Sequence, residues 1–421
     1  MAYKTVYLYP TYLNVKGNDV TYPLLKGLQV LEFGESISAP YCGKLLADMG
    51  ANVLKIERIS SGDSTREYGP FLNDDPHLER SGLYLYLNSN KKGITLNLET
   101  PTGMEIFHEL FTESDVYVQN LHPLEMDYLG LAWENLKHLN QKIVMASITP
   151  FGLTGPYRNW KAYDINLAAA GGICQGLGVA TKEPLTFGTP EVGYFAGASA
   201  CSSIMGAMLS KSVSGLGQHI DVAEVESMAG IYNGPEALMA VYQWRVTRRT
   251  GHHALDFPYP NCILRCKDGF VFVGAPEGRQ WRNLLDLMGN PDWAKEDRFR
   301  NRTSMNNEYA EEVDSYMEQW LSNYTKNELL DMALDAQIPL APVRGFDEVR
   351  NDPSLSSQFI PISRDYTGEV SYPGTPYDLV GLEHSSPCPA PTLGQHNMEI
   401  YCGQLGYTPE ELTKLYQAEI I

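Results

Sequence analysis

The sequence is short of positive charge and has no long apolar run. Its 421 residues include 32 Lys and Arg against 51 Asp and Glu, a formal net charge of −19. Nonspecific binding to nucleic acid or anionic membrane needs clustered basic residues, so both are disfavoured and only a local basic pocket stays open. No stretch approaches a transmembrane span, and the tyrosine-rich start lacks the cationic and apolar regions of a signal peptide. We expect a cytoplasmic protein.

Paired cysteines and nucleotide-binding glycines are scarce as well. The seven cysteines are scattered without a C-x-x-C pair, which predicts reduced thiols. Cys262 and Cys266 are close in sequence, but no matching His or Cys cluster lies near them, so we expect no metal site. The stretch GGICQGLG, residues 171–178, follows a helical run and has the wrong spacing for a dinucleotide fingerprint. NAD binding is therefore disfavoured.

What the sequence does contain is a repeated alternation of strands and helices. Residues 28–33 (LQVLEF) are apolar and rich in β-formers, residues 41–49 space their apolar side chains as a helix does, and residues 52–57 (NVLKIE) predict the next strand. Strand, helix and strand in about thirty residues are typical of a βαβ unit with parallel strands. The alternation continues to residue 148, and a helix of small residues follows over 196–209. The predicted fold class is α/β, with a Rossmann-like, doubly wound sheet.

The chain is too long for one hydrophobic core, and its composition changes beyond Lys267. There KDGFVFVGA predicts a strand and RQWRNLLDLMG predicts an amphipathic helix ended by glycine. Thr325 and Glu328 form a predicted capping box, which is a structural use of polar residues. We expect a leader, a large Rossmann-like domain, a linker with a small α/β domain, and a segment that returns to the large domain, at residues 1–26, 27–225, 226–350 and 351–421.

Polar side chains stand at the ends of several predicted strands. Doubly wound sheets bind ligands beyond the carboxyl ends of their strands, so these side chains are the first candidates for a pocket. They are Glu32, Glu57, Arg58 and Asn120.

Five stretches, taken together and in order, resemble the class III CoA-transferases, the family of formyl-CoA and carnitine CoA-transferases and of α-methylacyl-CoA racemases. The match runs nearly end to end. It implies the two domains already expected, and also two chains interlocked like links. It further implies a CoA thioester as substrate and no covalently bound cofactor. The stretches are LKGLQVLEFGESISAPYCGKLLADMGANVLKIE, NSNKKGITLNLETPTG, GQHIDVAEVES, IPLAPVRGFDEVRNDPSL and PTLGQHNMEI.

The family's chemistry needs one aspartate, in a motif of the form (Gly/Ala)-Asp-x-x-(Ser/Ala)-Gly. Here the stretch reads VGYFAG and places Gly193 at the nucleophile's position, a register that Tyr163 in KAYDIN supports. Glu191 lies two residues earlier, about 6–7 Å along an extended chain, which is more than its extra methylene recovers. A charge at a helix start is the structural alternative for Glu191. Racemisation is disfavoured, because Tyr163 replaces the histidine before Asp164 and Gly193 replaces the second acid.

Four residues match CoA contacts of the family. Arg58 in KIERISSGD corresponds to an arginine near the adenosine end, and Leu96, Asn120 and Lys161 correspond to other contacts. A guanidinium or ammonium group suits nucleotide phosphates, although Arg58 and Lys161 can equally be solvated surface charges. One departure is Tyr128 in MDYLGL, where the family usually places a phosphate-binding arginine. Losing that charge-assisted contact costs about 1.5–3 kcal/mol.

Loss of both the aspartate and an arginine fits a heteromer better than a homodimer. The succinyl-CoA:benzylsuccinate CoA-transferases of anaerobic toluene degradation resemble this arrangement, since they pair two unlike subunits of which one lacks the aspartate. The resemblance implies a noncatalytic subunit whose paralogous partner supplies the acid, with acyl-CoA and carboxylic acids as substrates. Two alternatives stay open: a homodimeric CoA-transferase that uses Glu191, and a catalytically silent CoA-binding or scaffold protein of the same fold.

Overall fold

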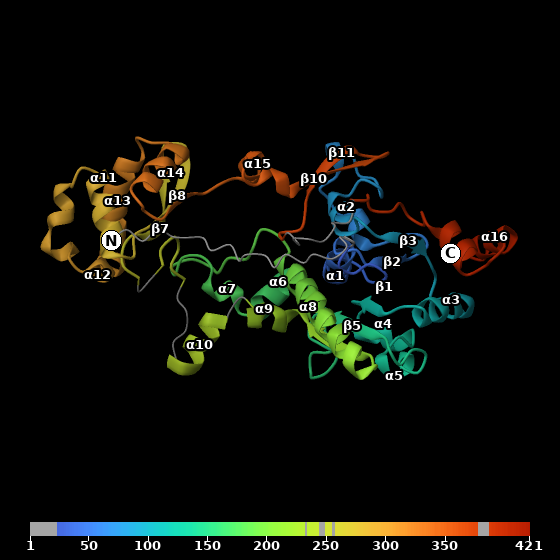
Figure 1. The fold of residues 1–421 in the computed structure, drawn as a ribbon. Helices are drawn as coiled ribbons and strands as arrows, with labels where there is room; N and C mark the ends of the chain where they lie inside the picture. Colours follow the sequence, from blue (N-terminus) through green and yellow to red (C-terminus); the bar gives the residue numbers. More distant parts are fainter. Residues whose placement is uncertain (1–22, 232–233, 244–248, 255–256, 378–386) are drawn as a thin grey trace, which may run out of the picture.

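The computed structural model describes residues 23–231, 234–243, 249–254, 257–377 and 387–421. Residues 1–22 of the expected leader therefore lie outside the described residues. Figure 1 shows a larger body that holds a parallel sheet and a smaller body of helices around a short sheet, with an extended connection between them.

The larger body is built on a six-stranded sheet in which every neighbouring pair is parallel. Leu31 lies opposite both Leu54 and Tyr117, as expected of apolar strands that are covered on both faces. The strands are β1 (Gln29–Phe33), β2 (Asn52–Glu57), β3 (Lys92–Thr95), β4 (Val116–Gln119), β5 (Val144–Thr149) and β6 (Gln218–Ala223). Their order, β3-β2-β1-β4-β5-β6, is that of doubly wound nucleotide-binding folds, so the predicted fold class is confirmed.

Helices cover both faces of this sheet. The helices of the larger body are α1 (Ser38–Asp48), α2 (Gly82–Leu87), α3 (Pro101–Thr112), α4 (Pro123–Tyr128), α5 (Trp133–Leu136), α6 (Asp164–Ala170), α8 (Glu191–Ser214), α9 (Glu224–Ile231), a π-helical turn (Met398–Gln404) and α16 (Pro409–Gln417). Two further helices, α7 (Ile173–Gly176) and α10 (Gly234–Gln243), lie away from the sheet, next to α6 and α9 (Figure 1). One apolar cluster joins α1 and α8 to the sheet. The other joins α3, the π-helical turn and α16 to the opposite face, so the end of the chain returns to the larger body.

Helix α8 is longer than the helix predicted over 196–209. By length and composition it is also apolar enough to cross a membrane, so the expectation that no stretch approaches a span is wrong. Seven of its residues are buried, and it packs against α1, β5 and β6. Its apolar character therefore fits a core helix of a globular fold. Its outer face keeps apolar side chains in solvent, among them Val213 with 88% of its surface exposed.

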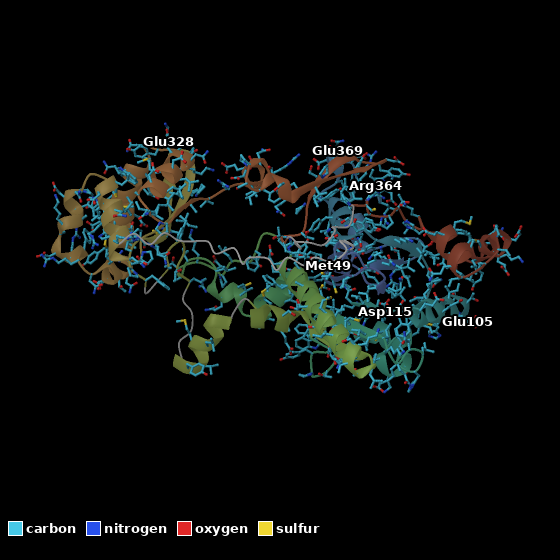
Figure 2. The ribbon with its side chains drawn as sticks, in the orientation of Figure 1. Met49, Glu105, Asp115, Glu328, Arg364 and Glu369 are labelled. Carbon is cyan, nitrogen blue, oxygen red and sulfur yellow. The ribbon has the colours of Figure 1, made fainter. Side chains whose placement is uncertain are left out.

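The smaller body has an antiparallel sheet in the order β7-β8-β9. Its elements are β7 (Asn261–Cys266), β8 (Gly269–Gly274), α11 (Gly278–Leu287), α12 (Arg302–Glu308), α13 (Ala310–Leu321), α14 (Lys326–Asp335) and β9 (Leu340–Pro342). The predicted capping box is confirmed: the Thr325 amide donates to Glu328 Oε2 at 2.8 Å, and the Glu328 amide donates to Thr325 Oγ1 at 3.3 Å. Figure 2 labels Glu328 in this body.

A connection containing α15 (Phe346–Asn351) leads back to a hairpin of β10 (Phe359–Arg364) and β11 (Gly368–Pro373). Figure 2 labels Arg364 and Glu369 on this hairpin, at the larger body. The Arg364 guanidinium pairs with the Glu79 carboxylate, and the side chains of both are largely buried. The hairpin is thereby fastened to the loop before α2.

Candidate functional site

The carboxyl edge of the sheet collects three of the four predicted CoA contacts. Arg58, Leu96 and Asn120 are the first residues after β2, β3 and β4. The strand order reverses between β1 and β4, and a doubly wound sheet opens its ligand crevice at that reversal. The fourth residue, Lys161, is exposed in the connection between β5 and α6.

Arg58 is held by two carboxylates. Its Nε lies 2.7 Å from Glu35 Oε1, and its Nη2 lies 2.7 Å from Glu125 Oε1. The Arg58 side chain is 39% exposed while it joins the turn after β1 to helix α4. Burial lowers the pKa of Arg58, but hydrogen bonds to Glu125 and Glu35 outweigh burial and raise the pKa, so the group stays charged. A phosphate that binds Arg58 must share the guanidinium with these acids or displace them.

Asn120 and Leu96 support the backbone at this edge. Asn120 Oδ1 accepts from the Glu35 amide at 2.9 Å, while its Nδ2 donates to the Glu35 carbonyl at 2.7 Å and to Ser38 Oγ at 3.2 Å. Asn120 thereby fixes the turn between β1 and α1. Leu96 is 1% exposed in the core, and its amide donates to the Glu57 carbonyl at 2.9 Å. A ligand at this edge can therefore meet the Leu96 backbone but not its side chain.

Tyr128 ends α4 with 78% of its surface exposed. The neighbouring Asp127 pairs with Arg158, whose Nη2 lies 2.7 Å from Asp127 Oδ2. Arg158, 31 residues after Asp127, thereby brings a guanidinium to the residue that precedes Tyr128 in the chain. The sequence does not predict a role for Arg158, because only the folded path of the loop after β5 brings it to α4.

Glu32 and Glu57 do not face a pocket, so this part of the sequence interpretation is wrong. The Glu32 side chain is fully buried and contacts Lys55 Nζ at 2.9 Å and Lys91 Nζ at 2.8 Å. Glu57 is equally buried and contacts Arg66 Nε at 2.7 Å. A buried carboxylate is tolerated only where it is paired and hydrogen-bonded, and both acids meet that condition. They tie the strands and the following loops together behind the carboxyl edge.

The first turn of α8 is closed around Gly193, the position that matches the family's aspartate. A Cβ added at Gly193 would lie 2.9 Å from Ile37 Cβ and 3.0 Å from Ile37 Cγ2. One turn later, a Cβ added at Gly197 would lie 2.6 Å from the Ser38 carbonyl oxygen. Two glycines four residues apart therefore let α8 approach the start of α1, where any larger residue would collide. Ile37 is 7% exposed and occupies the space beside position 193.

The two acids weighed from the sequence are both tied to helix starts. Asp164, the first residue of α6, accepts from the Val192 amide at 2.9 Å and so caps α8. Glu191, the first residue of α8, accepts from the Thr189 hydroxyl. Its charge also suits the positive end of the helix dipole. Both side chains therefore make hydrogen bonds that stabilise this turn.

A third acid, Glu224, was not singled out in the sequence. It begins α9 and is hydrogen-bonded to the Ser38 side chain near the start of α1. Burial raises the pKa of Glu224, and the nearby charge of Asp164 raises it further. Burial also raises the pKa of Asp164, against the opposing effect of the Val192 and Gly193 amides. Nothing in the local sequence marks Glu224, because its neighbours come from α1 and α6.

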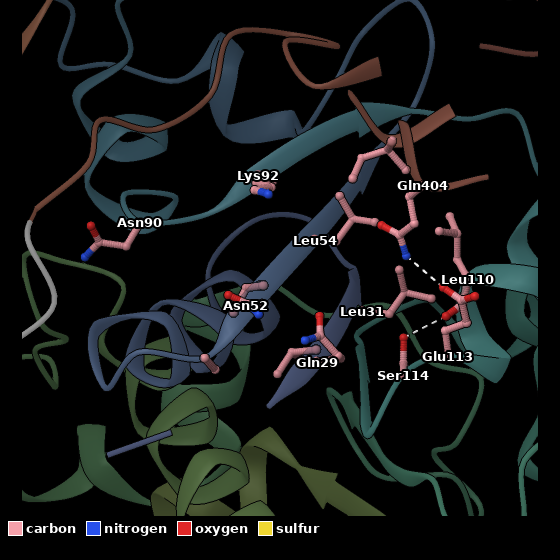
Figure 3. A pocket seen from close by; sticks show the side chains of 14 residues that line it. Gln29, Leu31, Asn52, Leu54, Asn90, Lys92, Leu110, Glu113, Ser114 and Gln404 are labelled. Carbon is pink, nitrogen blue, oxygen red and sulfur yellow. Dashed lines mark hydrogen bonds between the residues drawn. The ribbon is translucent and has the colours of Figure 1, made fainter. Parts of the chain in front are cut away.

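A hollow of about 420 Å³ lies at the opposite edge of the sheet. Its lining includes Gln29, Asn52 and Lys92, the first residues of β1, β2 and β3. Figure 3 shows Gln404 reaching across one side of it, where its Nε2 donates to Glu113 Oε2 at 2.8 Å. Ligands of doubly wound sheets bind at the carboxyl ends, so this hollow is not the candidate site.

Comparison with known proteins identifies the family of this chain. The sequence pattern of CoA-transferase family III matches residues 25–397. The chain belongs to CoA-transferase family III. Members of family III take CoA thioesters as substrates and need no resident cofactor, so the expected family and substrate type are confirmed.

Two relatives of this family III chain come from Chloroflexus aurantiacus. The beta subunit of succinyl-CoA--L-malate CoA-transferase is 29% identical over 413 residues, which cover 96% of this chain and 100% of the relative. Succinyl-CoA--D-citramalate CoA-transferase is 31% identical over 406 residues, which cover 94% and 98%. A solved CAIB/BAIF family protein from Brucella suis has a TM-score of 0.82 at 26% identity, with 91% of this chain and 99% of that chain covered.

Proposed function

We propose that this chain is the noncatalytic subunit of a heteromeric CoA-transferase. A paralogous partner supplies the aspartate, and the assembly moves CoA from succinyl-CoA to an aryl-substituted dicarboxylate such as benzylsuccinate. The observation that carries the proposal is the closed space at Gly193, where a Cβ would lie 2.9 Å from Ile37 Cβ. Glu191 and Asp164 are engaged at helix starts, which argues against either acid taking over the attack.

The proposed chemistry is acyl transfer through the partner's carboxylate. The carboxylate attacks the carbonyl of succinyl-CoA and gives a mixed anhydride and CoA thiolate. The thiolate then attacks the aspartyl carbonyl, which releases succinate and leaves an aspartyl-CoA thioester. The acceptor carboxylate attacks that thioester, and the thiolate attacks the acceptor's carbonyl in the new anhydride, which regenerates the aspartate. One thioester replaces another, so the exchange needs no ATP.

The donor and the heteromeric state draw support from the relatives. Both Chloroflexus proteins are named for succinyl-CoA, and one is named a beta subunit. The acceptor class rests on the resemblance to benzylsuccinate enzymes. Exposed apolar side chains on α8 and α10, such as Val213 and Tyr242, offer a contact surface for an interlocked partner. In that arrangement the smaller body of this chain would cover part of the partner's active site. The seven cysteines are free, which favours the cytoplasm.

This chain keeps part of a CoA site of its own in the proposal. Arg58 and Lys161 are its proposed phosphate contacts, and Asn120 shapes the turn whose Glu35 pairs with Arg58. Leu96 contributes its backbone. Arg158, paired with Asp127, is a further guanidinium at α4 that the proposal assigns to the phosphates.

The test co-expresses the chain with candidate paralogues and incubates the purified complex with succinyl-CoA. Hydroxylamine or borohydride then traps the acyl or CoA adduct, and peptide mass spectrometry locates it. The adduct is expected on the partner's aspartate. The chain purified alone is expected to show no transfer and no adduct.

Three other results would each replace the proposal. Transfer by the chain alone, abolished in Glu191→Gln but kept in the exposed control Glu183→Gln, would establish a homodimeric enzyme that uses Glu191. An adduct on Asp164 would assign the attack to that residue. Failure to copurify with any paralogue, together with no CoA binding in calorimetry, would establish a scaffold protein.

A further inference from the structure

Two adjacent histidines meet an aspartate where the chain enters the smaller body. His252 and His253 belong to a described segment, 249–254, that bridges to Val179 of the larger body and to Cys262 of β7. The Nε2 atoms of both histidines approach one oxygen of Asp314, Oδ2, at 2.9 Å and 2.8 Å.

The hydrogen bonds around His253 fix where its proton lies. Asn306 Nδ2 donates to the Ala254 carbonyl at 2.8 Å and to the Phe257 carbonyl at 3.1 Å, so Asn306 presents its oxygen to His253. His253 Nδ1 lies 3.1 Å from that oxygen and must carry a hydrogen. In neutral His253 the lone pair therefore sits on Nε2, 2.8 Å from Asp314 Oδ2.

Two electron-rich atoms at that separation need a positive charge between them. The charge can be a second proton on His253 or a metal ion. Because a second Nε2, that of His252, points at the same oxygen, three ligand atoms lie within 4.8 Å of one another.

Further hydrogen bonds orient the side chains of this cluster. Asp314 Oδ1, the oxygen turned away from the histidines, accepts from Tyr259 OH at 2.9 Å. Both His253 and Asp314 thus have outer partners that fix their orientation, as metal ligands usually do. The His253 side chain is 8% exposed and that of His252 is 50% exposed, so one side of the cluster opens to solvent for a water ligand.

We propose that His252 Nε2, His253 Nε2 and Asp314 Oδ2 bind a divalent transition-metal ion, Zn²⁺ by ligand class, which fastens the interdomain segment to α13. Two imidazoles and a carboxylate suit Zn²⁺, with bonds of about 2.0–2.2 Å. Tetrahedral bonds of that length set ligand atoms about 3.3 Å apart, so the present contacts open slightly on binding. The half-exposed His252 has room to make that adjustment. The site differs from the expectation of no metal, which considered only the cysteines.

The test uses the full chain without a histidine tag, treated with chelator and dialysed. Calorimetric titration with ZnCl2 is expected to show one tight equivalent, and the melting temperature is expected to rise until that equivalent is bound. Co²⁺ as a probe is expected to give the visible bands of a tetrahedral centre. Affinity for Zn²⁺ is expected to fall at least about tenfold in His252→Gln and in Asp314→Asn.

Two controls separate this centre from other zinc ligands. His138→Gln alters an exposed histidine of the larger body, and Cys388→Ser alters an exposed cysteine; both are expected to bind Zn²⁺ as the unaltered chain does. His252 is half exposed, so His252→Gln is expected to fold even if Asp314→Asn does not. Absence of a stoichiometric Zn²⁺ site, or equal affinity in His252→Gln and His138→Gln, would overturn the proposal in favour of a protonated His253.

Discussion

The two sides of the candidate site are built on different principles. At the carboxyl ends of β2 and β4, charged and amide groups line the edge, and buried ion pairs such as Arg66 with Glu57, 2.7 Å apart, hold the loops behind them. At the start of α8, close packing decides the arrangement. Gly193 and Gly197 have no side chains, so the start of α1 can pack directly against the backbone of α8. Charge organises the first region and steric fit organises the second. The proposed binding edge and the packing around Gly193 therefore depend on different residues and can be altered separately.

At the strand ends, the largest loss of stability is expected when a buried charge loses its partner. Arg66→Met leaves the Glu57 carboxylate unpaired in the interior, and we expect a loss of about 3–5 kcal/mol in the free energy of unfolding. Urea denaturation measures it. Arg58→Met at the same edge removes a pair that is 39% exposed and should cost no more than about 1 kcal/mol. Equal losses in the two variants would show that burial does not distinguish these ion pairs.

The same edge should carry CoA affinity through Arg58. Replacing Arg58 by Met removes one charge-assisted phosphate contact, worth about 1.5–3 kcal/mol of binding free energy. Calorimetry with CoA should therefore give a dissociation constant that is roughly 10- to 100-fold higher. Arg298→Met is the matched control, since Arg298 is also held by two carboxylates, Glu296 and Glu312, and is 38% exposed in the smaller body. Equal CoA affinity in the two variants would remove Arg58 from the site.

The first region was largely predictable because strand ends follow from local apolar runs. The strand predicted at 52–57 has those bounds in the structure, which put Arg58 at the edge. The roles of Glu32 and Glu57 were not predictable, since their partners Lys91 and Arg66 reach them only through folded loops. A buried ion pair and an open active-site acid look alike in a sequence.

In the second region, sequence alignment to the family motif locates Gly193 but says nothing of what surrounds it. Ile37 lies far from Gly193 along the chain, and only the packing of α8 on α1 brings the two together. The helix was also predicted too short, over 196–209, because its first and last turns carry polar residues such as Glu191 and Lys211. Contacts between helices, and polar helix ends, carry no local apolar signature.

At the start of α8, adding a side chain at position 193 should destabilise the fold. Gly193→Asp forces a Cβ against Ile37, so we expect a loss of about 1–3 kcal/mol in unfolding free energy and no transfer activity in the chain alone. Adding Ile37→Ala should recover part of that loss, which a double-mutant cycle measures as a nonadditive term. Gly206→Asp in the same helix is the control, because a Cβ there meets nothing within 4 Å.

Equal losses for Gly193→Asp and Gly206→Asp would mean that helix propensity, and not the Ile37 contact, sets the cost. A hydroxylamine-trapped adduct on Asp at position 193 in the Ile37→Ala background would sharpen the comparison differently. It would show that the binding edge still delivers a thioester to α8 once space is made.

The smallest expected effect comes from Glu224, where burial and the charge of Asp164 raise the pKa. The folded state then binds the Glu224 proton more tightly than the unfolded state does. This proton's contribution to stability is complete below the unfolded pKa, about 4.3, and is lost as pH rises through the higher folded pKa. Glu224→Gln removes this titration. The variant should therefore lose little at pH 4 and gain up to about 1 kcal/mol relative to the unaltered chain at neutral pH.

Thermal melting of Glu224→Gln at the two pH values measures this difference, with the exposed Glu183→Gln as a control that should show none. The raised pKa of Asp164 has a separate local cause, its own burial, and persists without Glu224. A difference that stays the same at both pH values would instead assign the effect of Glu224→Gln to its hydrogen bond with Ser38. In that case polar contacts as well as packing would stabilise the region around the start of α8. This region would then differ less from the strand ends, where charged groups stabilise the structure.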